Sequence, residues 1–215
     1  MTLKICHISD SHLQILPELP EADVLVHTGD ALNSGSLSEL EQFRQQLLQV
    51  KDKYDRIIFI PGNHDRIFED TYHSAKQFLE QEVNNLTVLN HEPYDYKGYK
   101  WFGTSFQPFI GRWAFGVKDN LDLYEKYRQI PIETEILLTH CPPKGILDFH
   151  SLYGRLGSKA LTLALKELPN LKAHLFGHIH EAYGLDYKNK VWYSNAALCN
   201  EDYEVANEPR IIELE

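Results

Sequence analysis

Short apolar runs alternate with longer amphipathic segments along the 215-residue chain. Runs of four to seven residues rich in Ile, Leu, Val and Phe, bounded by Gly, Asp, Asn or Ser, are typical of strands. About nine such strands are expected, more than a single open sheet of this size holds comfortably. They cover residues 3–9, 23–28, 56–62, 86–90, 100–105, 135–140, 173–178, 191–197 and 210–215.

Three segments between these runs have helical periodicity. Apolar residues recur every three or four positions across residues 36–54, and Ser36 with Glu39 forms a capping box at the start. A second helix is expected over residues 72–83 and a third after Gly157, through Leu168. Strands that alternate with helices predict one layered α/β domain over residues 1–215, with the strands divided between two sheets.

Composition and charge narrow the classes of function. Apolar residues make up 43% of the chain. The formal charge is −10, and this negative charge disfavours long nucleic acid as a partner. No run is long and apolar enough for a membrane span, and the first residues lack the apolar core of a secretory signal. Three well-separated cysteines suggest no disulfide framework, so we expect a cytoplasmic protein.

Candidate ligands follow five of the apolar runs. In α/β proteins the carboxyl ends of strands are where loops build sites, and glycine allows the backbone to turn sharply there. Any one of these residues is typical of a turn, a helix cap or a structural histidine, but five such endings in one chain favour a common site. The endings read Asp10-Ser11-His12, Gly29-Asp30, Gly62-Asn63-His64-Asp65, His140 and Gly177-His178-Ile179-His180.

The mixture of carboxylate, amide and imidazole ligands has a chemical preference. It favours Mn, Fe, Zn or Ni over calcium, and the absence of cysteine from the set argues against a structural zinc site. In extended backbone, side chains two positions apart point the same way, as would those of His178 and His180.

The order D-x-H, G-D, G-N-H-D, H, G-H-x-H resembles that of the calcineurin-like metallophosphoesterases, and it extends from Asp10 to His180. This resemblance implies a four-layer α/β/β/α sandwich with two mixed β-sheets flanked by helices. Further stretches are similar to the metallophosphoesterase-domain (MPPED) branch, whose members are linked to 2′,3′-cyclic nucleotides. They are FGTSFQPF (102–109), THCPPKGILDF (139–149), GSKAL (157–161), GHIHEAYG (177–184) and NAALCNEDY (195–203).

The resemblance also implies two divalent metal ions, with manganese favoured for activity. Asp10, His12 and His180 would hold one ion, Asn63, His140 and His178 the other, and Asp30 would bridge them. A hydroxide shared by the metals would attack phosphorus, and His64 would protonate the leaving oxygen as general acid. The two imidazoles of residues 178 and 180 would then serve one metal each.

The sequence departs from the family's protein phosphatases after Asp30. Where those enzymes carry an Asp that partners the acid histidine and a phosphate-binding Arg, this chain has Asn33 and Ser34. We therefore expect a weaker partner for His64 and no clamp arginine from this loop. Arg112, Lys144 or Arg155 could replace the clamp, although an ordinary surface charge is the simpler interpretation of each.

Some residues are candidates for substrate contact. The aromatic stretch 101–115 either pins a loop to the core or stacks on a nucleobase, and His150 lies downstream of the ligand His140. The substrate candidates are Asn33, Phe106, Trp113, His150 and Arg155. Most histidines outside the motifs are expected to be structural or solvent-facing: His7, His27, His73, His91 and His174.

The function expected is hydrolysis of a small phosphodiester or cyclic nucleotide by a dinuclear metal-dependent phosphoesterase. The alternatives are a phosphomonoesterase or nuclease that uses the same site, or a non-catalytic scaffold with this fold. A scaffold should have lost ligands, whereas all seven ligand positions and His64 are filled here. The oligomeric state stays open.

Overall fold

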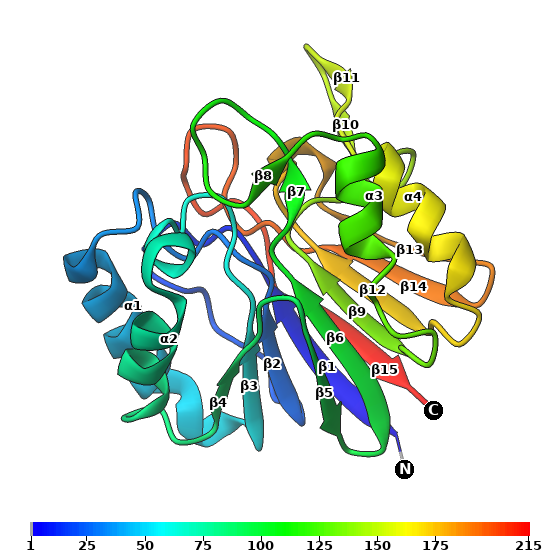
Figure 1. Cartoon of the computed structure of the whole chain (residues 1–215). Coiled ribbons are helices and arrows are strands. Elements are labelled where there is room, and N and C mark those ends of the chain that lie inside the picture. The colour runs from blue at the N-terminus through cyan, green and yellow to red at the C-terminus, as the bar shows by residue number, and fades with distance from the viewer. Residues whose placement is uncertain (1) are drawn as a thin grey trace.

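Two mixed sheets face each other in the computed structural model, which describes residues 2–215 (Figure 1). The first sheet has five strands and the second has six, and each combines parallel and antiparallel pairs. In spatial order the first contains β15 (Arg210–Leu214), β1 (Leu3–Ile8), β2 (Val24–His27), β3 (Arg56–Phe59) and β4 (Leu86–Val88). The second contains β13 (Gly184–Lys188), β14 (Val191–Asn195), β12 (Ala173–Phe176), β9 (Ile136–Thr139), β6 (Tyr99–Thr104) and β5 (Glu92–Tyr96).

Helices cover the outer surface of each sheet. Helices α1 (Leu37–Val50) and α2 (Ile67–Glu80) lie over the first sheet, and α3 (Leu121–Tyr127) and α4 (Lys159–Ala164) lie over the second (Figure 1). The expected four-layer α/β/β/α sandwich is therefore confirmed. Short 3-10 turns and two-residue strands complete the chain: η1 (Lys51–Lys53), η2 (Leu165–Glu167), η3 (His180–Ala182), β7 (Gln107–Pro108), β8 (Gly116–Val117), β10 (Phe149–His150) and β11 (Gly154–Arg155).

Three buried clusters hold the four layers together. Alternate side chains of the central strands point to opposite faces, so each strand contributes to two of these clusters. Ile5 and Val26 of the first sheet meet Trp101 and Leu175 of the second in the cluster between the sheets. The outer clusters pack the sheets against their helices, as Phe43 does from α1.

The helix boundaries differ from the sequence prediction in one helix and agree in another. Helix α2 begins at Ile67 rather than near residue 72, and Thr71 inside it has non-helical dihedral angles. The turn before the kink buries Phe68, and the part after it buries Ala75 and Leu79. Helix α1 begins where predicted, and the predicted capping box between Ser36 and Glu39 is present.

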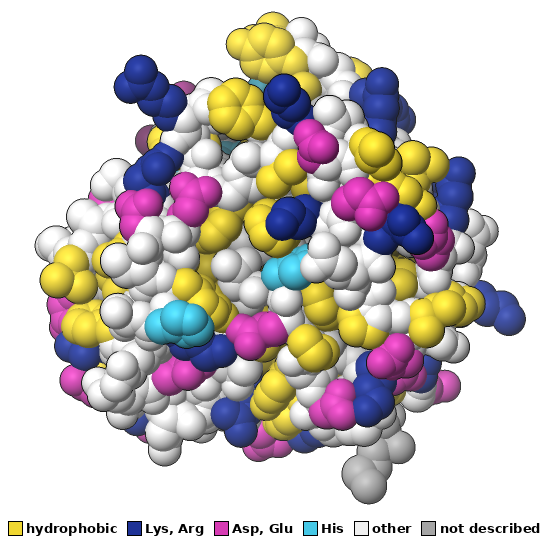
Figure 2. Space-filling model, viewed as in Figure 1, with side chains coloured by type: hydrophobic (Ala, Val, Ile, Leu, Met, Phe, Trp, Pro, Cys, Tyr) yellow, Lys and Arg dark blue, Asp and Glu magenta, His cyan; other side chains and the backbone are white. Residues whose placement is uncertain are grey.

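The surface carries charges of both signs. Figure 2 shows Lys and Arg side chains interspersed with Asp and Glu across the face viewed. Within residues 2–215, no helix combines the length and the apolar character that crossing a membrane requires.

Candidate metal centre

The carboxyl ends of strands from both sheets meet at one end of the sandwich. Ser9, just after β1, pairs with Ala197, just after β14, in a parallel bridge that joins the two sheets. The amide of Ser9 donates to the carbonyl of Ala196 at 2.9 Å, and the amide of Leu198 donates to the carbonyl of Ser9 at 2.8 Å. This junction brings loops from the two sheets within contact of one another.

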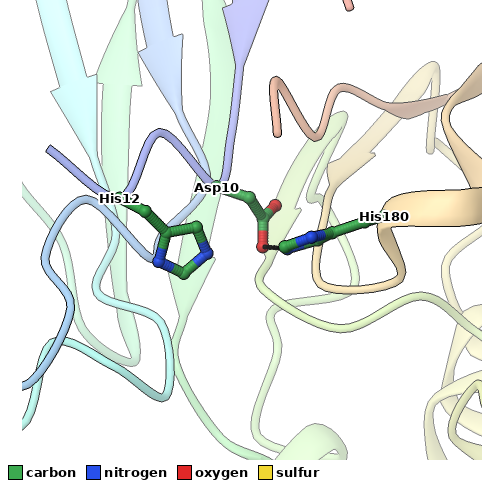
Figure 3. Close-up of side chains that lie close together, drawn as sticks. All are labelled: Asp10, His12 and His180. Atoms are coloured by element: carbon green, nitrogen blue, oxygen red, sulfur yellow. Dashed lines mark ion pairs between the residues drawn. The ribbon is translucent and has the colours of Figure 1, made fainter. Parts of the chain in front are cut away.

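Asp10, His12 and His180 form the first group of candidate ligands (Figure 3). Asp10 and His12 follow β1 of the first sheet, and His180 follows β12 of the second. The carboxylate of Asp10 lies between the two imidazoles, with Oδ1 3.3 Å from Nε2 of His180. Asp10 also accepts the amide hydrogen of His178 at 2.9 Å, so it contacts both sheets.

Asp30, His140 and His178 form the second group, and Asn63 adjoins it. Nε2 of His140 lies 3.2 Å from Oδ2 of Asp30 and 3.0 Å from Oδ1 of Asn63. The rings of His140 and His178 contact edge to face, with centroids 4.9 Å apart. The histidines of the G-H-x-H motif thus fall into different groups, His178 into this one and His180 into the first.

The backbone at several of these residues is unusual for side-chain-bearing positions. Asp10, His12, Asp30 and His178 all have positive φ, between 44° and 70°. Non-glycine residues in this region cost free energy and persist only where the surroundings impose them, which is common at functional sites. The left-handed turns reverse the chain directly after each strand and direct the ligand side chains toward the junction.

Hydrogen bonds orient three of the candidate ligand histidines. Nδ1 of His12 lies 3.2 Å from the carbonyl oxygen of Leu32. Nδ1 of His140 lies 2.8 Å from the carbonyl oxygen of Thr28, and Nδ1 of His180 lies 2.8 Å from that of Asn200. A carbonyl can only accept, so Nδ1 carries a proton, and in the neutral ring Nε2 keeps its lone pair. Backbone carbonyls fix the tautomer of metal-binding histidines in this way.

The surroundings of the Nε2 atoms show that a cation fits here. Nε2 of His12 is buried with no hydrogen-bond partner, and Nε2 of both His140 and His180 faces carboxylate oxygen. A lone pair directed at carboxylate oxygen is repulsive unless a proton or a metal ion lies between them. Oxygen and imidazole donors in this arrangement suit a divalent transition metal.

Titration behaviour indicates the same demand for positive charge. Burial lowers the pKa of His140, but the charge of Asp30 and its hydrogen bond outweigh burial and raise the pKa to about 9. His180 is likewise raised to a pKa of about 9, by Asp10 against the effect of burial. Burial opposes ionisation of Asp10 and Asp30, yet the surrounding histidines hold both pKa values well below the usual range. The centre therefore stabilises carboxylates together with positive charge on the imidazoles around them.

His64 lies beside the second group and is held on two sides. Its Nδ1 lies 2.6 Å from the carbonyl oxygen of Asn33, and its Nε2 lies 3.9 Å from Oδ2 of Asp30. The ring stacks on the indole of Trp113, with centroids 3.9 Å apart and planes inclined by 28°. The partner of Nδ1 is thus a neutral carbonyl and not a carboxylate.

Asp65, the last residue of the G-N-H-D motif, supports both loops from below. Its buried carboxylate accepts amide hydrogens from Gly62 at 2.7 Å, Asp30 at 2.8 Å and Leu32 at 2.9 Å. Burial, together with the negative charge of Asp30, raises the pKa of Asp65 to about 7 despite these donors. The motif includes this residue, but only the structure shows that it positions the loop that carries Asp30.

A cavity of about 180 Å³ opens onto the centre. Its walls contain candidate ligands, the proposed acid and two aromatic side chains, and they include neither Lys nor Arg. The lining residues are Asp30, Asn63, His64, Ile110, Trp113, His178, His180, Glu201 and Tyr203.

Only one of the five predicted substrate residues lines this cavity, namely Trp113. Phe106 packs against His91 and under Lys126, away from the cavity. The side chain of Asn33 is exposed, and this residue acts through its carbonyl. Arg155 forms an ion pair with Asp148 at 2.6 Å. The clamp role proposed for it from the sequence is therefore not supported by its position.

His150 also stays outside the cavity, but it contacts a residue that lines it. Its Nε2 lies 3.4 Å from Oε2 of Glu201. Glu201, Tyr203 and Ile110 were not singled out by the sequence. The first two lie in the stretch 195–203 that carries part of the family resemblance, which was the available signal for them.

Comparisons with known proteins agree with this architecture. The family model for calcineurin-like phosphoesterases matches residues 3–182. Human metallophosphoesterase domain-containing protein 1 is 30% identical over 228 residues, which cover 96% of this chain and 69% of that protein. The 3′,5′-cyclic adenosine monophosphate phosphodiesterase CpdA of Escherichia coli K12 is 25% identical over 192 residues, covering 86% and 64% respectively.

Among solved structures, TT1561 of Thermus thermophilus has a TM-score of 0.62 at 14% identity, covering 91% of this chain and 89% of that one. This likeness shows a shared fold. The family model and the human relative confirm the resemblance inferred from the motifs: the chain belongs to the calcineurin-like phosphoesterase family, in the branch of the metallophosphoesterase domain-containing proteins.

Proposed function

We propose that this protein is a dinuclear metal-dependent phosphoesterase that hydrolyses a small phosphodiester or cyclic nucleotide. One observation carries the proposal. Seven side chains with metal-ligand chemistry and one further histidine, from five separate loops, converge below a single cavity at the junction of the two sheets. A protein with a purely structural role would not require metal-ligand side chains at the ends of strands from both sheets.

The ligands divide between two ions in this proposal. Asp10, His12 and His180 would hold one ion, and Asn63, His140 and His178 would hold the other. Asp30 would be shared, because its charge acts on the imidazoles of both groups. When bound, two divalent ions supply Lewis acidity, which lowers the pKa of water and neutralises charge on the phosphate oxygens.

His64 is suited to proton transfer at the leaving oxygen. Asn33 and Trp113 fix the ring, so that Nε2 is directed toward the centre while Nδ1 is occupied. A proton on Nε2 can be donated to a leaving alkoxide only from the imidazolium form, since Nδ1 keeps its own. The backbone carbonyl of Asn33 accepts without adding charge, so it would stabilise the imidazolium less than the carboxylate of a histidine–carboxylate dyad does.

Trp113 supports a substrate with an aromatic group. The indole is 42% exposed, one face covers His64, and the ring borders the cavity beside Ile110. Stacking of a base on such a ring contributes roughly 1–3 kcal/mol. A relative whose name describes a cyclic nucleotide phosphodiesterase agrees with a nucleotide, although its similarity is distant.

Trp113→Ala should therefore raise KM for cyclic nucleotides by about 10-fold, the lower part of the stacking range, and leave KM for small alkyl esters nearly unchanged. Phe106→Ala is the matched control, since this aromatic residue of the same loop region faces away from the cavity. Equal KM values for nucleotides in Trp113→Ala and the wild type would remove the stacking role.

The proposed activity itself is tested with purified protein. Elemental analysis should find about two divalent ions per chain after loading with manganese, zinc, iron or nickel. A panel of phosphomonoesters, phosphodiesters and 2′,3′- and 3′,5′-cyclic nucleotides should then show metal-dependent hydrolysis, greatest for diesters and abolished by chelation. Two bound ions with no hydrolysis of any ester would refute the enzymatic role.

A further inference from the structure

Glu201 places a carboxylate at the edge of the cavity above the centre. It lines the cavity together with His178, His180 and Tyr203, and its side chain is 47% exposed. None of the proposed roles of ligand, acid or base-stacking residue belongs to it. A negative charge is unexpected here, because the substrate of a phosphoesterase is itself an anion.

The turn that carries Glu201 is fixed to the centre. The amide of Asn200 donates to the carbonyl of Glu204 at 2.9 Å, and the side chain of Asn200 accepts the amides of Asp202 and Glu204 at 3.0 Å. The carbonyl of Asn200 also receives Nδ1–H of His180 at 2.8 Å. The residue directly before Glu201 thus orients a candidate metal ligand.

His150 contacts the carboxylate of Glu201. Nδ1 of His150 accepts the amide hydrogen of Leu152 at 3.1 Å and lies 3.7 Å from Oε1 of Glu181. Since Nδ1 accepts, Nε2 carries the proton, and it lies 3.4 Å from Oε2 of Glu201. A donor therefore holds the carboxylate of Glu201 in place from the side away from the cavity.

Neither Lys nor Arg offsets Glu201 among the residues that line the cavity. Two arginines are paired elsewhere: Arg66 contacts the carbonyl of Arg112 and lies 3.5 Å from Glu69, and Arg155 pairs with Asp148. The side chain of Arg112 is exposed and does not line the cavity. The loop after Asp30 adds Asn33 and Ser34, both uncharged. Among the lining residues, only His64, His178 and His180 can add positive charge to that of bound metals.

The charge of Glu201 then favours one class of ester. Two divalent ions with Asp10 and Asp30 would carry about two net positive charges, and Glu201 lowers by one the charge that a substrate meets. A phosphodiester brings only a single negative charge toward Glu201. A phosphomonoester, whose second pKa lies near 6, carries close to two negative charges at neutral pH, and the additional charge would face Glu201.

We propose that Glu201 is a specificity-determining residue that selects monoanionic phosphodiesters over dianionic phosphomonoesters at this centre. The inference rests on the proposed phosphoesterase function and adds the charge of the preferred substrate. Glu201 acts by repulsion of the wrong substrate, a common source of specificity.

Two esters that release the same p-nitrophenolate test the proposal: bis(p-nitrophenyl) phosphate, a monoanion, and p-nitrophenyl phosphate, a dianion at pH 7.5. The measured quantity is the ratio of kcat/KM for the diester to that for the monoester, with manganese-loaded protein. Glu201→Gln should lower this ratio by about fivefold, the order expected for one unit charge at a partly solvated site. Glu201→Lys should lower it further in the same direction.

Asp202→Asn is the matched control. It removes one negative charge from the same turn, but Asp202 does not line the cavity, so the ratio should change by less than about twofold. An unchanged ratio in both Glu201 variants, or an equal change in Asp202→Asn, would overturn the inference. A wild-type protein that binds two metals but hydrolyses neither ester would instead refute the proposed function, so the two failures are distinct.

Discussion

Replacing Gly177 by alanine should damage the first group of ligands by steric overlap. A Cβ at this position would lie 2.0 Å from Oδ2 of Asp10, 2.1 Å from Oγ of Ser9 and 2.6 Å from Cβ of Ser9. Non-bonded carbon and oxygen atoms normally come no closer than about 3.2 Å, so the overlap exceeds about 1 Å on both oxygens. Neither residue can yield easily, because Ser9 forms the bridge between the sheets and Asp10 is buried.

The expected cost follows from that overlap. Overpacking of a well-ordered interior costs about 1–3 kcal/mol, and three contacts with short, tethered side chains place Gly177→Ala near the upper end. For a chain of this length, about 3 kcal/mol lowers Tm by roughly 6–12 °C. Displacement of Asp10 by about 1 Å should also weaken the ion held with His12 and His180, and lower kcat about 100-fold.

Urea unfolding in the presence of a chelator measures the loss of stability that the steric overlap causes. Calorimetric titration with manganese measures the loss of one of the two bound ions. Gly184→Ala is the control, because its Cβ would meet only the flexible end of Leu147 at 3.0 Å and a carbonyl at 3.8 Å. Wild-type stability and two tightly bound ions in Gly177→Ala would refute the view that glycine is required for close approach to Asp10.

Three further changes test other parts of the centre. Asp30→Ala should abolish activity and lower manganese content from about two ions per chain toward zero, whereas two ions retained at wild-type affinity would contradict its role as the shared ligand. His64→Ala should keep both ions and slow alkyl esters at least about 10-fold more than p-nitrophenyl esters, because only poor leaving groups need a general acid; equal losses would exclude that role. Burial lowers the pKa of His174 to about 3, so the metal-free fold should lose about 1.4 kcal/mol per pH unit below pH 6.5 from this residue alone. In urea unfolding between pH 6 and pH 4, His174→Gln should reduce the slope of stability against pH by that amount, and His73→Gln, at an exposed position, should leave it unchanged.

The sequence predicted the central strands and the candidate ligands for the same reason. Strands β1, β2, β3, β9 and β12 are buried on both faces, so each reads as an apolar run with a sharp end. The residue types at those ends then stand out against the runs. Parallel pairing brings such ends to one edge of a sheet, which is why five loops distant along the chain could be expected to meet.

The two edge strands of the second sheet and one helix were missed because little of them is buried, whereas the edge strands of the first sheet, β4 and β15, were predicted. The edge strands β5 and β13 contain mostly half-buried or exposed residues, so their composition resembles that of a loop. Helix α3 has seven residues and buries only Leu123 and Tyr127, too few for a visible helical repeat. These elements form through pairing and packing with neighbours that a local pattern does not contain.

Partners of the site residues were equally invisible in the sequence. The contact of His64 with the carbonyl of Asn33 depends on backbone direction, and a carbonyl carries no signature of residue type. Glu201 reaches the centre only because β14 ends at the same junction as β1, after which the chain turns back at residues 200–204. A family motif identifies ligands, whereas the selectivity of a site can depend on such turns.

The ligand positions themselves depart from local backbone preference. Asp10, His12, Asp30 and His178 adopt the left-handed region, in which an isolated chain would rarely place them. The amides accepted by Asp10 and by Asp65 impose this geometry from neighbouring loops, at a cost that folding alone would not require. Local backbone preferences are obeyed in the strands but not at the ligand positions. Such departures are expected at residues that serve chemistry. Positive φ also occurs at residues outside the centre, such as Lys97 and Asn189, so the backbone strain supports a functional site only together with the ligand side chains that these four positions carry.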